Sequence, residues 1–196
     1  MKKAFTTTLL AGSLLVFGAT QAVAAEQTFI IDSTHTFPNF SYSHFGLSTQ
    51  HSKFSNTQGT VVLDQEKRTG KVDVTIDMTS VQTGFDVFDE HIQSEDFFHT
   101  AKYPTATFKG DEVTIEDNKP VAVSGELTIK GITKPVTLES SDCLYLDEHP
   151  MEGRPAIGAN AEVTVLRSDF GMDLYTPHVS DEVTITISFE AIEEEK

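Results

Sequence analysis

The chain has 196 residues, with 30 acidic against 14 basic residues and a formal net charge of −16 at pH 7. It lacks the clustered Lys and Arg that a phosphate backbone requires, which excludes nucleic acid as an expected partner. Cys143 is the single cysteine, so no intramolecular disulfide can form, and we expect it to be a small buried apolar residue rather than a reactive thiol.

The first residues predict export. Lys2 and Lys3 precede an apolar run at 9–17, and Ala22-Val23-Ala24 follows as a cleavage signal. This pattern predicts a secretory signal peptide over residues 1–24, because the run is too short for a membrane-spanning helix. Residues 25–196 are expected to form one domain.

Apolar and polar residues alternate along most of the remaining chain, which is typical of half-buried β-strands. The alternating runs lie at 29–31, 37–43, 59–63, 71–78, 105–115, 121–129, 135–144, 156–166 and 183–192. We therefore expect a mainly β fold of eight or nine antiparallel strands, in a barrel or a sandwich. A barrel of this size is either filled by its own side chains or holds one small ligand.

The clearest strand pair is predicted at 121–138. Four apolar residues of its first half are expected to share one face: Val121, Val123, Leu127 and Ile129. Gly131 then marks a turn. Pro135 is expected to open the second strand, where it owes no ladder hydrogen bond.

The stretch 80–100 breaks this alternation and predicts a helix-bearing connection. Its apolar residues follow helical spacing at Val81, Phe85, Phe88 and Ile92. Ser80 is the expected N-cap, and Gly84 is the weak point of the helix. We expect the helix to pack on the barrel mouth, where its phenylalanines, with Phe97 and Phe98, either attach it to the barrel or line a ligand cavity.

The order and spacing of several short motifs resemble the YceI-like family of secreted, lipocalin-like, polyisoprenoid-binding proteins. The most specific match is GELTIKG at 125–131, followed by TKPV at 133–136. The other matching residues are Ile31-Asp32 with His35, the run 40–46 with Phe54, Thr79-Ser80-Val81 with Thr83-Gly84, Asp89, His91, Ile92, Ser94, Asp96-Phe97-Phe98, Tyr103-Pro104 with Thr107-Phe108, and the runs 167–172 and 179–183.

This resemblance implies an extended eight-stranded antiparallel lipocalin-like β-barrel with a helix-bearing connection near 80–100. It implies non-catalytic binding, sequestration or transport of a long-chain lipophilic molecule, such as an isoprenoid or prenyl quinone, without a cofactor. Together with the signal peptide it implies a periplasmic location. A homodimer and transient contact with inner-membrane lipid or quinone enzymes are further expectations.

Two residues depart from the family pattern. Phe88 stands where a basic residue is usual, and Ser52 stands where a glycine is usual. Because a phenylalanine cannot neutralise a phosphate, we expect a less anionic ligand.

Candidate ligand-binding residues fall into two groups. Those expected to line an apolar cavity are Phe40, Phe45, Phe85, Phe88, Phe108 and Phe170. Those expected to contact a polar group at the cavity mouth are His44, Asp89, His91, Arg167 and Asp169. Each polar candidate also has a structural interpretation. His44 could bond to backbone at a strand end, Asp89 and His91 could cap the helix or pair locally, and Arg167 could form an ion pair with Asp169.

Two other functions stay open. An acidic secreted stress or surface-interaction protein would have a barrel filled by its own side chains. A hydrolase would use Asp89 and His91, although the chain has no G-x-S-x-G motif. No metal is expected, since neither H-E-x-x-H nor a cysteine cluster occurs, and we interpret the acidic stretch at 147–152 as a solvated loop.

Overall fold

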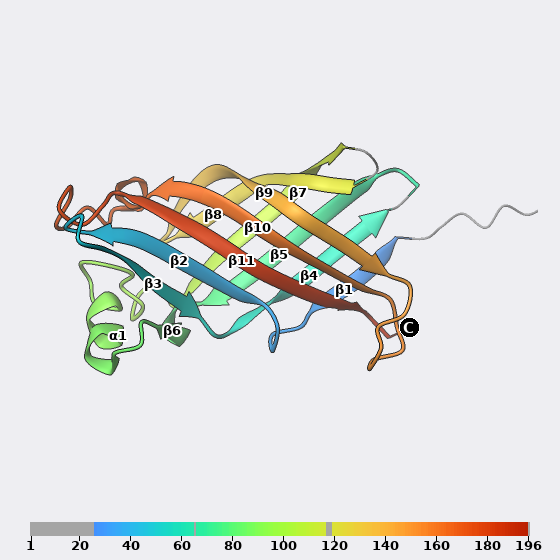
Figure 1. Ribbon diagram of the computed structural model, residues 1–196, viewed down its shortest axis with the longest axis horizontal. Coiled ribbons are helices and arrows are strands. Elements are labelled where there is room, and N and C mark those ends of the chain that lie inside the picture. The colour runs from blue at the N-terminus through green and yellow to red at the C-terminus, as the bar shows by residue number, and fades with distance from the viewer. Residues whose placement is uncertain (1–25, 65, 117–118, 196) are drawn as a thin grey trace, which may run out of the picture.

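The computed structural model describes residues 26–64, 66–116 and 119–195, and the predicted signal peptide at 1–24 lies outside them. One antiparallel sheet contains its strands in the order β1-β4-β5-β7-β8-β9-β10-β11-β2-β3-β6. A further pairing of β1 with β11 closes the first eight strands of this order into a long barrel (Figure 1). The expected eight-stranded antiparallel barrel is confirmed.

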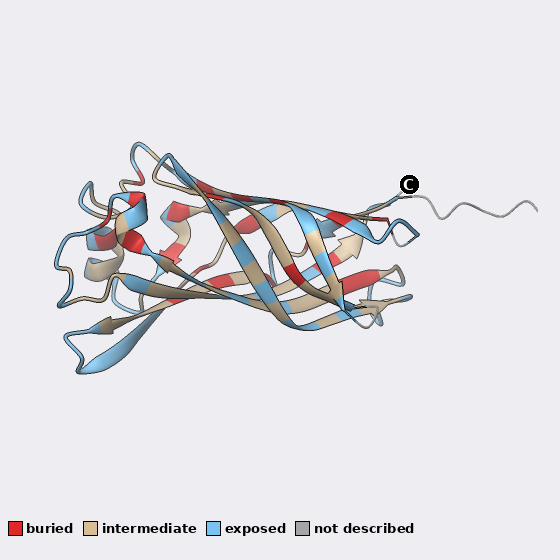
Figure 2. Ribbon diagram, turned by 90° about the horizontal axis from the view of Figure 1, so that it is seen from above, coloured by how far each residue is buried: buried red, intermediate tan, exposed pale blue. Residues whose placement is uncertain are grey.

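The barrel strands are β1 (Gln27–Ile31), β4 (Thr57–Asp64), β5 (Thr69–Asp77), β7 (Thr105–Glu116), β8 (Lys119–Ile129), β9 (Ile132–Leu146), β10 (Ala156–Leu166) and β11 (Glu182–Glu193). The sheet continues from β11 into β2 (Phe37–His44), β3 (Ser48–Phe54) and β6 (Val81–Gln82). Exposed and half-buried positions alternate along the strands (Figure 2), as the sequence period requires.

The turn between β8 and β9 is a two-residue hairpin at Lys130-Gly131, with φ of 52° and 75°. Positive φ at both positions is typical of a type I′ turn. Pro135 was expected to open the second strand, but it lies inside β9 opposite Glu126. β10 pairs with β9 only from Glu139 onward, so the missing N–H of Pro135 removes no bond to β10.

A bulge between β7 and β8 changes the predicted inner face of β8. Ile115 pairs with Pro120 while the preceding residue on β7 pairs with Ala122, which leaves Val121 as the extra residue. Pro120, Ala122 and Val123 consequently line the barrel interior, and Val121 does not. The prediction that Val121 shares the face of Val123 was wrong because a bulge shifts the alternation by one residue.

The connection at 80–100 carries a helix, as predicted, but the helix begins later and is shorter than the apolar spacing indicated. The connection contains a 3₁₀ turn, η1 (Met78–Ser80), then β6, and a short helix, α1 (Asp86–Ile92). Ser80 does not cap α1, because its Oγ donates to the Asp77 carbonyl at 2.6 Å and accepts from the amides of Ser55 and Asn56. Gly84, with φ of 88°, separates β6 from α1. No helix in the described ranges has the length and apolar character needed to cross a bilayer.

Strand β3 has a sequence, STQHSKF, that lacks apolar alternation and was not expected as a strand. Its backbone pairs with β2 from Asn39 opposite Lys53 to His44 opposite Ser48. Backbone pairing to a neighbour that is itself held by β11 therefore determines this strand, rather than its own side chains.

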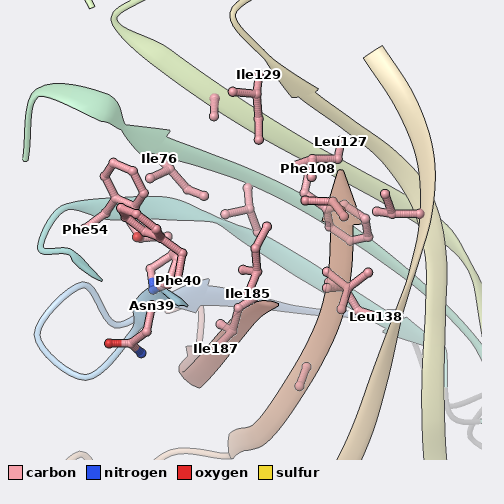
Figure 3. A pocket seen from close by; sticks show the side chains of 18 of the residues that line it. Asn39, Phe40, Phe54, Ile76, Phe108, Leu127, Ile129, Leu138, Ile185 and Ile187 are labelled. Atoms are coloured by element: carbon pink, nitrogen blue, oxygen red, sulfur yellow. The ribbon is translucent and has the colours of Figure 1, made fainter. Parts of the chain in front are cut away.

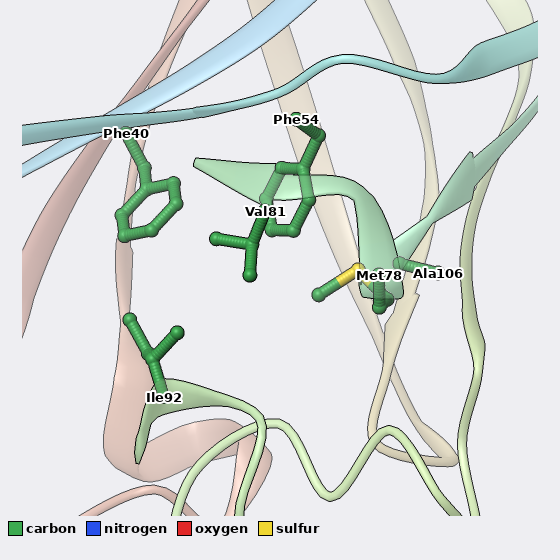
Figure 4. Packing of buried hydrophobic residues seen from close by; sticks show 6 residues of the cluster. All are labelled: Phe40, Phe54, Met78, Val81, Ile92 and Ala106. Atoms are coloured by element: carbon green, nitrogen blue, oxygen red, sulfur yellow. The ribbon is translucent and has the colours of Figure 1, made fainter. Parts of the chain in front are cut away.

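Buried apolar side chains attach the 78–100 connection to one end of the barrel. Figure 4 shows this cluster, which consists of Phe40, Phe54, Met78, Val81, Ile92 and Ala106. The ring of Phe98 packs against it, with centroids 5.9 Å from Phe40 and 5.6 Å from Phe54. Apolar burial thus fixes α1 beside the barrel end.

Candidate functional site

A cavity of about 430 Å³ lies inside the barrel and is lined by residues of all eight barrel strands, together with β2, α1 and the 3₁₀ turn η2 (Arg167–Phe170). Its volume falls within the roughly 300–1,000 Å³ range of small-molecule pockets. Ile76, Leu138 and Ile185 project into it from three different strands (Figure 3). The barrel is therefore not filled by its own side chains.

Aliphatic and aromatic side chains dominate the cavity wall. Among the described residues that line it, Arg167 is the single Lys or Arg, and none is Asp or Glu. An interior of this kind stabilises an apolar chain and disfavours a buried charge.

The cavity meets solvent at the α1 end of the barrel. Three of its lining residues, His44, His91 and Tyr175, are exposed, whereas the other described lining residues are buried or half-buried. His44 ends β2, His91 lies on α1, and Tyr175 lies in the segment after η2. These three residues define what we call the mouth.

Buried Arg167 organises the segment 171–181 beside the mouth, which we call the mouth loop. Its Nε donates to the Ser180 carbonyl at 2.8 Å, and its Nη2 donates to the carbonyls of Leu174 and Val179 at 2.9 and 3.0 Å. Its Nη1 donates to the Met172 carbonyl. Burial lowers the pKa of Arg167, and the charge of Asp181 opposes that effect. Most of its donors are thus committed to backbone.

Asp169 has a different role from the one expected. Its carboxylate lies 3.5 Å from Lys134 Nζ on the barrel exterior and does not line the cavity. The carboxylates that act on Arg167 are Asp181 and then Asp173, not Asp169. Asp181 also accepts hydrogen bonds from the amide and hydroxyl of Ser168. The alternative of an Arg167–Asp169 ion pair is contradicted, because Asp169 pairs with Lys134 instead.

Tyr42 is a cavity-lining residue that sequence reasoning missed. Burial raises the pKa of its hydroxyl, and the charge of Arg167 partly offsets the rise. The hydroxyl is therefore neutral near pH 7 and can donate or accept one hydrogen bond. The alternation along β2 contains the signal, since Pro38, Phe40, Tyr42 and His44 all line the cavity.

Four of the six predicted phenylalanines line the cavity: Phe40, Phe88, Phe108 and Phe170. Phe45 and Phe85 do not, and their side chains are 54% and 65% exposed. Phe45 lies in the β2–β3 turn with φ of 55°, where its ring stacks on His178. Phe85 precedes α1 in an extended conformation, outside the helical register that the sequence suggested.

Asp89 and His91 do not pair with each other. Asp89 Oδ1 accepts hydrogen bonds from the amide and hydroxyl of Thr83, both at 2.6 Å, and Asp89 does not line the cavity. His91 contacts the rings of Phe88 and Phe97, with centroids 6.0 and 5.0 Å away. These contacts do not form the nucleophile and base arrangement that the hydrolase alternative requires.

Two buried hydroxyls in the cavity wall have no hydrogen-bond partner among the described residues. They are Thr57 Oγ1 and Ser140 Oγ. Thr57 is only 1% exposed, so solvent does not satisfy it from outside the barrel. An unpaired buried hydroxyl costs about 1–3 kcal/mol, which a polar atom of a bound molecule could recover. Sequence alternation does not reveal such groups.

Cys143 also lines the cavity and is half-buried. Burial raises the pKa of its thiol, so the protonated form persists at neutral pH. Its position agrees with the expected role of a small apolar residue.

One group within the described part of the chain could offer three ligands to a metal ion: Asp32, His35 and Glu190. These residues do not line the cavity. His35 Nδ1 lies 2.7 Å from Asp32 Oδ2, and Thr34 bonds the other oxygen of Asp32, so local hydrogen bonds account for this arrangement.

Comparison with known proteins identifies close relatives over almost the whole chain. The model of the YceI-like domain matches residues 29–191. The protein YceI of Escherichia coli O6:H1 is 37% identical over 181 residues, which are 92% of this chain and 93% of that protein.

Solved structures share the barrel. The YceI protein of Campylobacter jejuni is 30% identical with a TM-score of 0.67, and the match covers 78% of this chain and 90% of that one. A polyisoprenoid binding domain from Saccharophagus degradans is 18% identical with a TM-score of 0.65, covering 86% and 99% of the two chains. At that identity the second likeness concerns the fold alone.

Proposed function

The chain belongs to the YceI-like family, and on that basis we propose that it binds a long-chain lipophilic molecule inside its barrel. The observation that carries this proposal is the apolar cavity of about 430 Å³, which meets solvent at the mouth formed by His44, His91 and Tyr175. The Saccharophagus degradans domain, which shares this fold, is named for polyisoprenoid binding, and a polyisoprenoid belongs to the ligand class proposed here.

Burial of the ligand's hydrocarbon supplies the affinity. Each buried CH₂ contributes about 0.8 kcal/mol, so a five-carbon prenyl unit contributes up to roughly 4 kcal/mol before association costs. Three buried units contribute up to roughly 12 kcal/mol, and after an association cost of about 4 kcal/mol the remaining ~8 kcal/mol corresponds to micromolar binding. Cavity length and width then select among ligands, with few polar contacts required.

The proposed head group is uncharged, as in a prenyl quinone or prenyl alcohol. A diphosphate would need cationic groups with free hydrogen-bond donors. Arg167 donates instead to backbone carbonyls of the mouth loop, and Phe88 has no cationic group. Tyr42, His44, His91 and Tyr175 provide hydrogen-bonding groups in the cavity wall and at the opening.

Carriage or sequestration of this ligand in the periplasm completes the proposal. It includes removal of the predicted signal peptide at 1–24 and folding of 25–196 as the lipid-binding domain. A homodimer and transient contact with inner-membrane lipid or quinone enzymes also belong to it. The alternative of an acidic surface-interaction protein with a filled barrel receives no support from a cavity of this volume.

Titration of delipidated, detergent-free protein with a prenyl quinone tests the proposal. Saturable binding at one molecule per chain, tighter than binding of the matching prenyl diphosphate, is the expected result. Absence of saturable binding for both compounds would refute lipid binding, and preference for the diphosphate would refute the uncharged head group.

A further inference from the structure

We propose that the mouth end of the barrel docks on a lipid bilayer of low charge, through the β2–β3 turn and the mouth loop. This inference rests on the proposed lipid binding. Phe45 and Leu47 project from the turn, and Leu174 and Tyr175 project from the mouth loop, all with exposed side chains. Leu47 is 85% exposed, and what marks the surface is that four exposed apolar side chains lie on two segments of the same barrel end.

Direct contacts join the two segments into one surface. The amide of Phe45 donates to the His178 carbonyl at 2.7 Å, and the amide of Ser180 donates to the Ser43 carbonyl at 2.9 Å. The ring of Phe45 stacks on His178 with centroids 6.0 Å apart. Since Arg167 holds the mouth loop from beneath, the exposed apolar groups are presented on a fixed frame.

The charge distribution favours a bilayer of low charge. The chain carries a net charge of −16, yet residues 33–63 contain no Asp or Glu and only Lys53 as a fixed charge. In the mouth loop, the exposed carboxylate of Asp173 lies next in sequence to the exposed Leu174. Zwitterionic phosphatidylcholine therefore suits the surface, whereas an anionic membrane would be repelled by the chain as a whole.

The surface formed by the β2–β3 turn and the mouth loop lies next to the cavity opening, which favours a bilayer as its binding partner. Tyr175 belongs both to the exposed surface and to the cavity wall, and His44 of the wall directly precedes Phe45. A hydrocarbon chain could move from the membrane into the cavity beneath these residues with little exposure to water. A stable protein interface buries about 1,200–2,000 Å². The apolar groups here are a few side chains at two loop tips, a shape that suits insertion between lipid head groups.

The chain contains no Trp, which permits a site-specific fluorescence test. Leu47→Trp places a single Trp at the proposed docking surface. Met151→Trp is the matched control, because Met151 is 89% exposed and lies in the β9–β10 loop at the opposite end of the barrel (Figure 1). With phosphatidylcholine vesicles we expect a blue shift and quenching by brominated acyl chains for Leu47→Trp alone.

A second pair of variants measures the consequence for lipid uptake. Leu47→Asp should slow transfer of a prenyl quinone from vesicles about tenfold, since one apolar anchor is replaced by a charge. Met151→Asp should leave transfer unchanged. Both variants should bind the quinone as tightly as wild type when it is added from ethanol without vesicles, because neither position lines the cavity.

Three results would overturn docking. The first is that the two Trp variants give equal spectra with vesicles, and the second is that Leu47→Trp shows a blue shift without vesicles that grows with protein concentration. The third is that Leu47→Asp leaves the rate of quinone transfer from vesicles unchanged. The second result would assign the surface to another copy of the chain. Failure of quinone binding from ethanol would refute the proposed function instead, while the fluorescence experiment would still decide whether this end contacts lipid.

Discussion

The Nε atom of Arg167 donates a hydrogen bond of 2.8 Å to the carbonyl oxygen of Ser180, and so links η2 to the far end of the mouth loop. The same guanidinium reaches the carbonyls of Leu174 and Val179. One buried side chain therefore holds the loop that borders the cavity opening. A cation in this place stabilises backbone rather than a ligand phosphate.

Replacement of this side chain should loosen the mouth loop. Arg167→Met leaves several carbonyls without their donor, so we expect the free energy of unfolding to fall by roughly 2–4 kcal/mol. Hydrogen exchange should accelerate at 172–180. Asp169→Asn is the control, and because the Lys134 pair is exposed we expect a change below about 1 kcal/mol. Unchanged protection of the loop in Arg167→Met would contradict this role.

The unpartnered hydroxyl of Thr57 predicts opposite effects on stability and on binding. Thr57→Val should leave the stability of the ligand-free protein unchanged or raise it, because an unsatisfied polar group is removed. Affinity for a prenyl quinone should fall roughly 2–10-fold if the ligand bonds this hydroxyl. Urea denaturation and quinone titration check the two effects. Thr57→Ser should bind as wild type, and a loss of ligand-free stability in Thr57→Val would show that the hydroxyl has a protein partner.

The backbones of β7 and β8 approach so closely at position 125 that a residue with a Cβ atom would clash there, which explains why glycine occupies it. A Cβ at this position would lie 2.3 Å from the Lys109 carbonyl oxygen and 2.6 Å from the Cα of Gly110, both backbone atoms. Gly125→Ala should therefore destabilise the barrel by roughly 1–3 kcal/mol, measured by chemical denaturation. Gly158→Ala is the matched control, since its Cβ would meet its nearest atom at 3.4 Å. Equal stability of the two variants would contradict the steric explanation.

The pair Asp32–His35 predicts a pH effect between neutral and mildly alkaline conditions. The hydrogen bond and charge of Asp32 raise the pKa of His35 above its ordinary value near 6.5. Burial raises the pKa of Asp32, but the bonds from Thr34 and His35 outweigh it and the net shift is downward. Because the folded pKa of His35 is raised, its contribution to stability is present below about pH 6.5 and is lost as the pH rises through the raised pKa.

The stability difference between wild type and His35→Gln should accordingly be larger at about pH 5.5 than at about pH 8.5. Denaturation midpoints at the two pH values give this difference, and an NMR titration of the His35 ring gives its pKa directly. A difference that stays constant with pH would contradict the ion pair.

Regular alternation explains why the barrel could be predicted from sequence. Runs such as Val72 to Ile76 and Ile157 to Val165 repeat every second residue, and those positions do line the cavity. The alternation failed at Val121, where a bulge shifts the register, and at β3, where backbone pairing outweighs side-chain character. Both features depend on neighbouring strands, which local sequence does not specify.

The mouth was harder to predict than the wall. Phe45 and Phe85 are large apolar residues of the kind that usually lie in a core. The positive φ of Phe45 in its turn and the extended backbone of Phe85 before α1 direct their side chains outward. Arg167 and Asp169 are close in sequence, yet the short turn η2 sends one inward and the other outward. Motif order therefore located the site region, while loop geometry determined which side chains reach the cavity.

The most direct test of lipid binding is native mass spectrometry of detergent-free protein from its own host, with lipid analysis of the extract. Wild type and Glu162→Phe, whose altered side chain points outward, should carry one long-chain molecule per chain. Ala161→Phe places a bulky ring in the cavity from the adjacent position, so the purified variant should be folded but free of the long-chain molecule. Wild-type protein that is free of lipid, and stays free after incubation with prenyl quinones, would contradict lipid binding. An adduct retained by Ala161→Phe would contradict its location in the barrel.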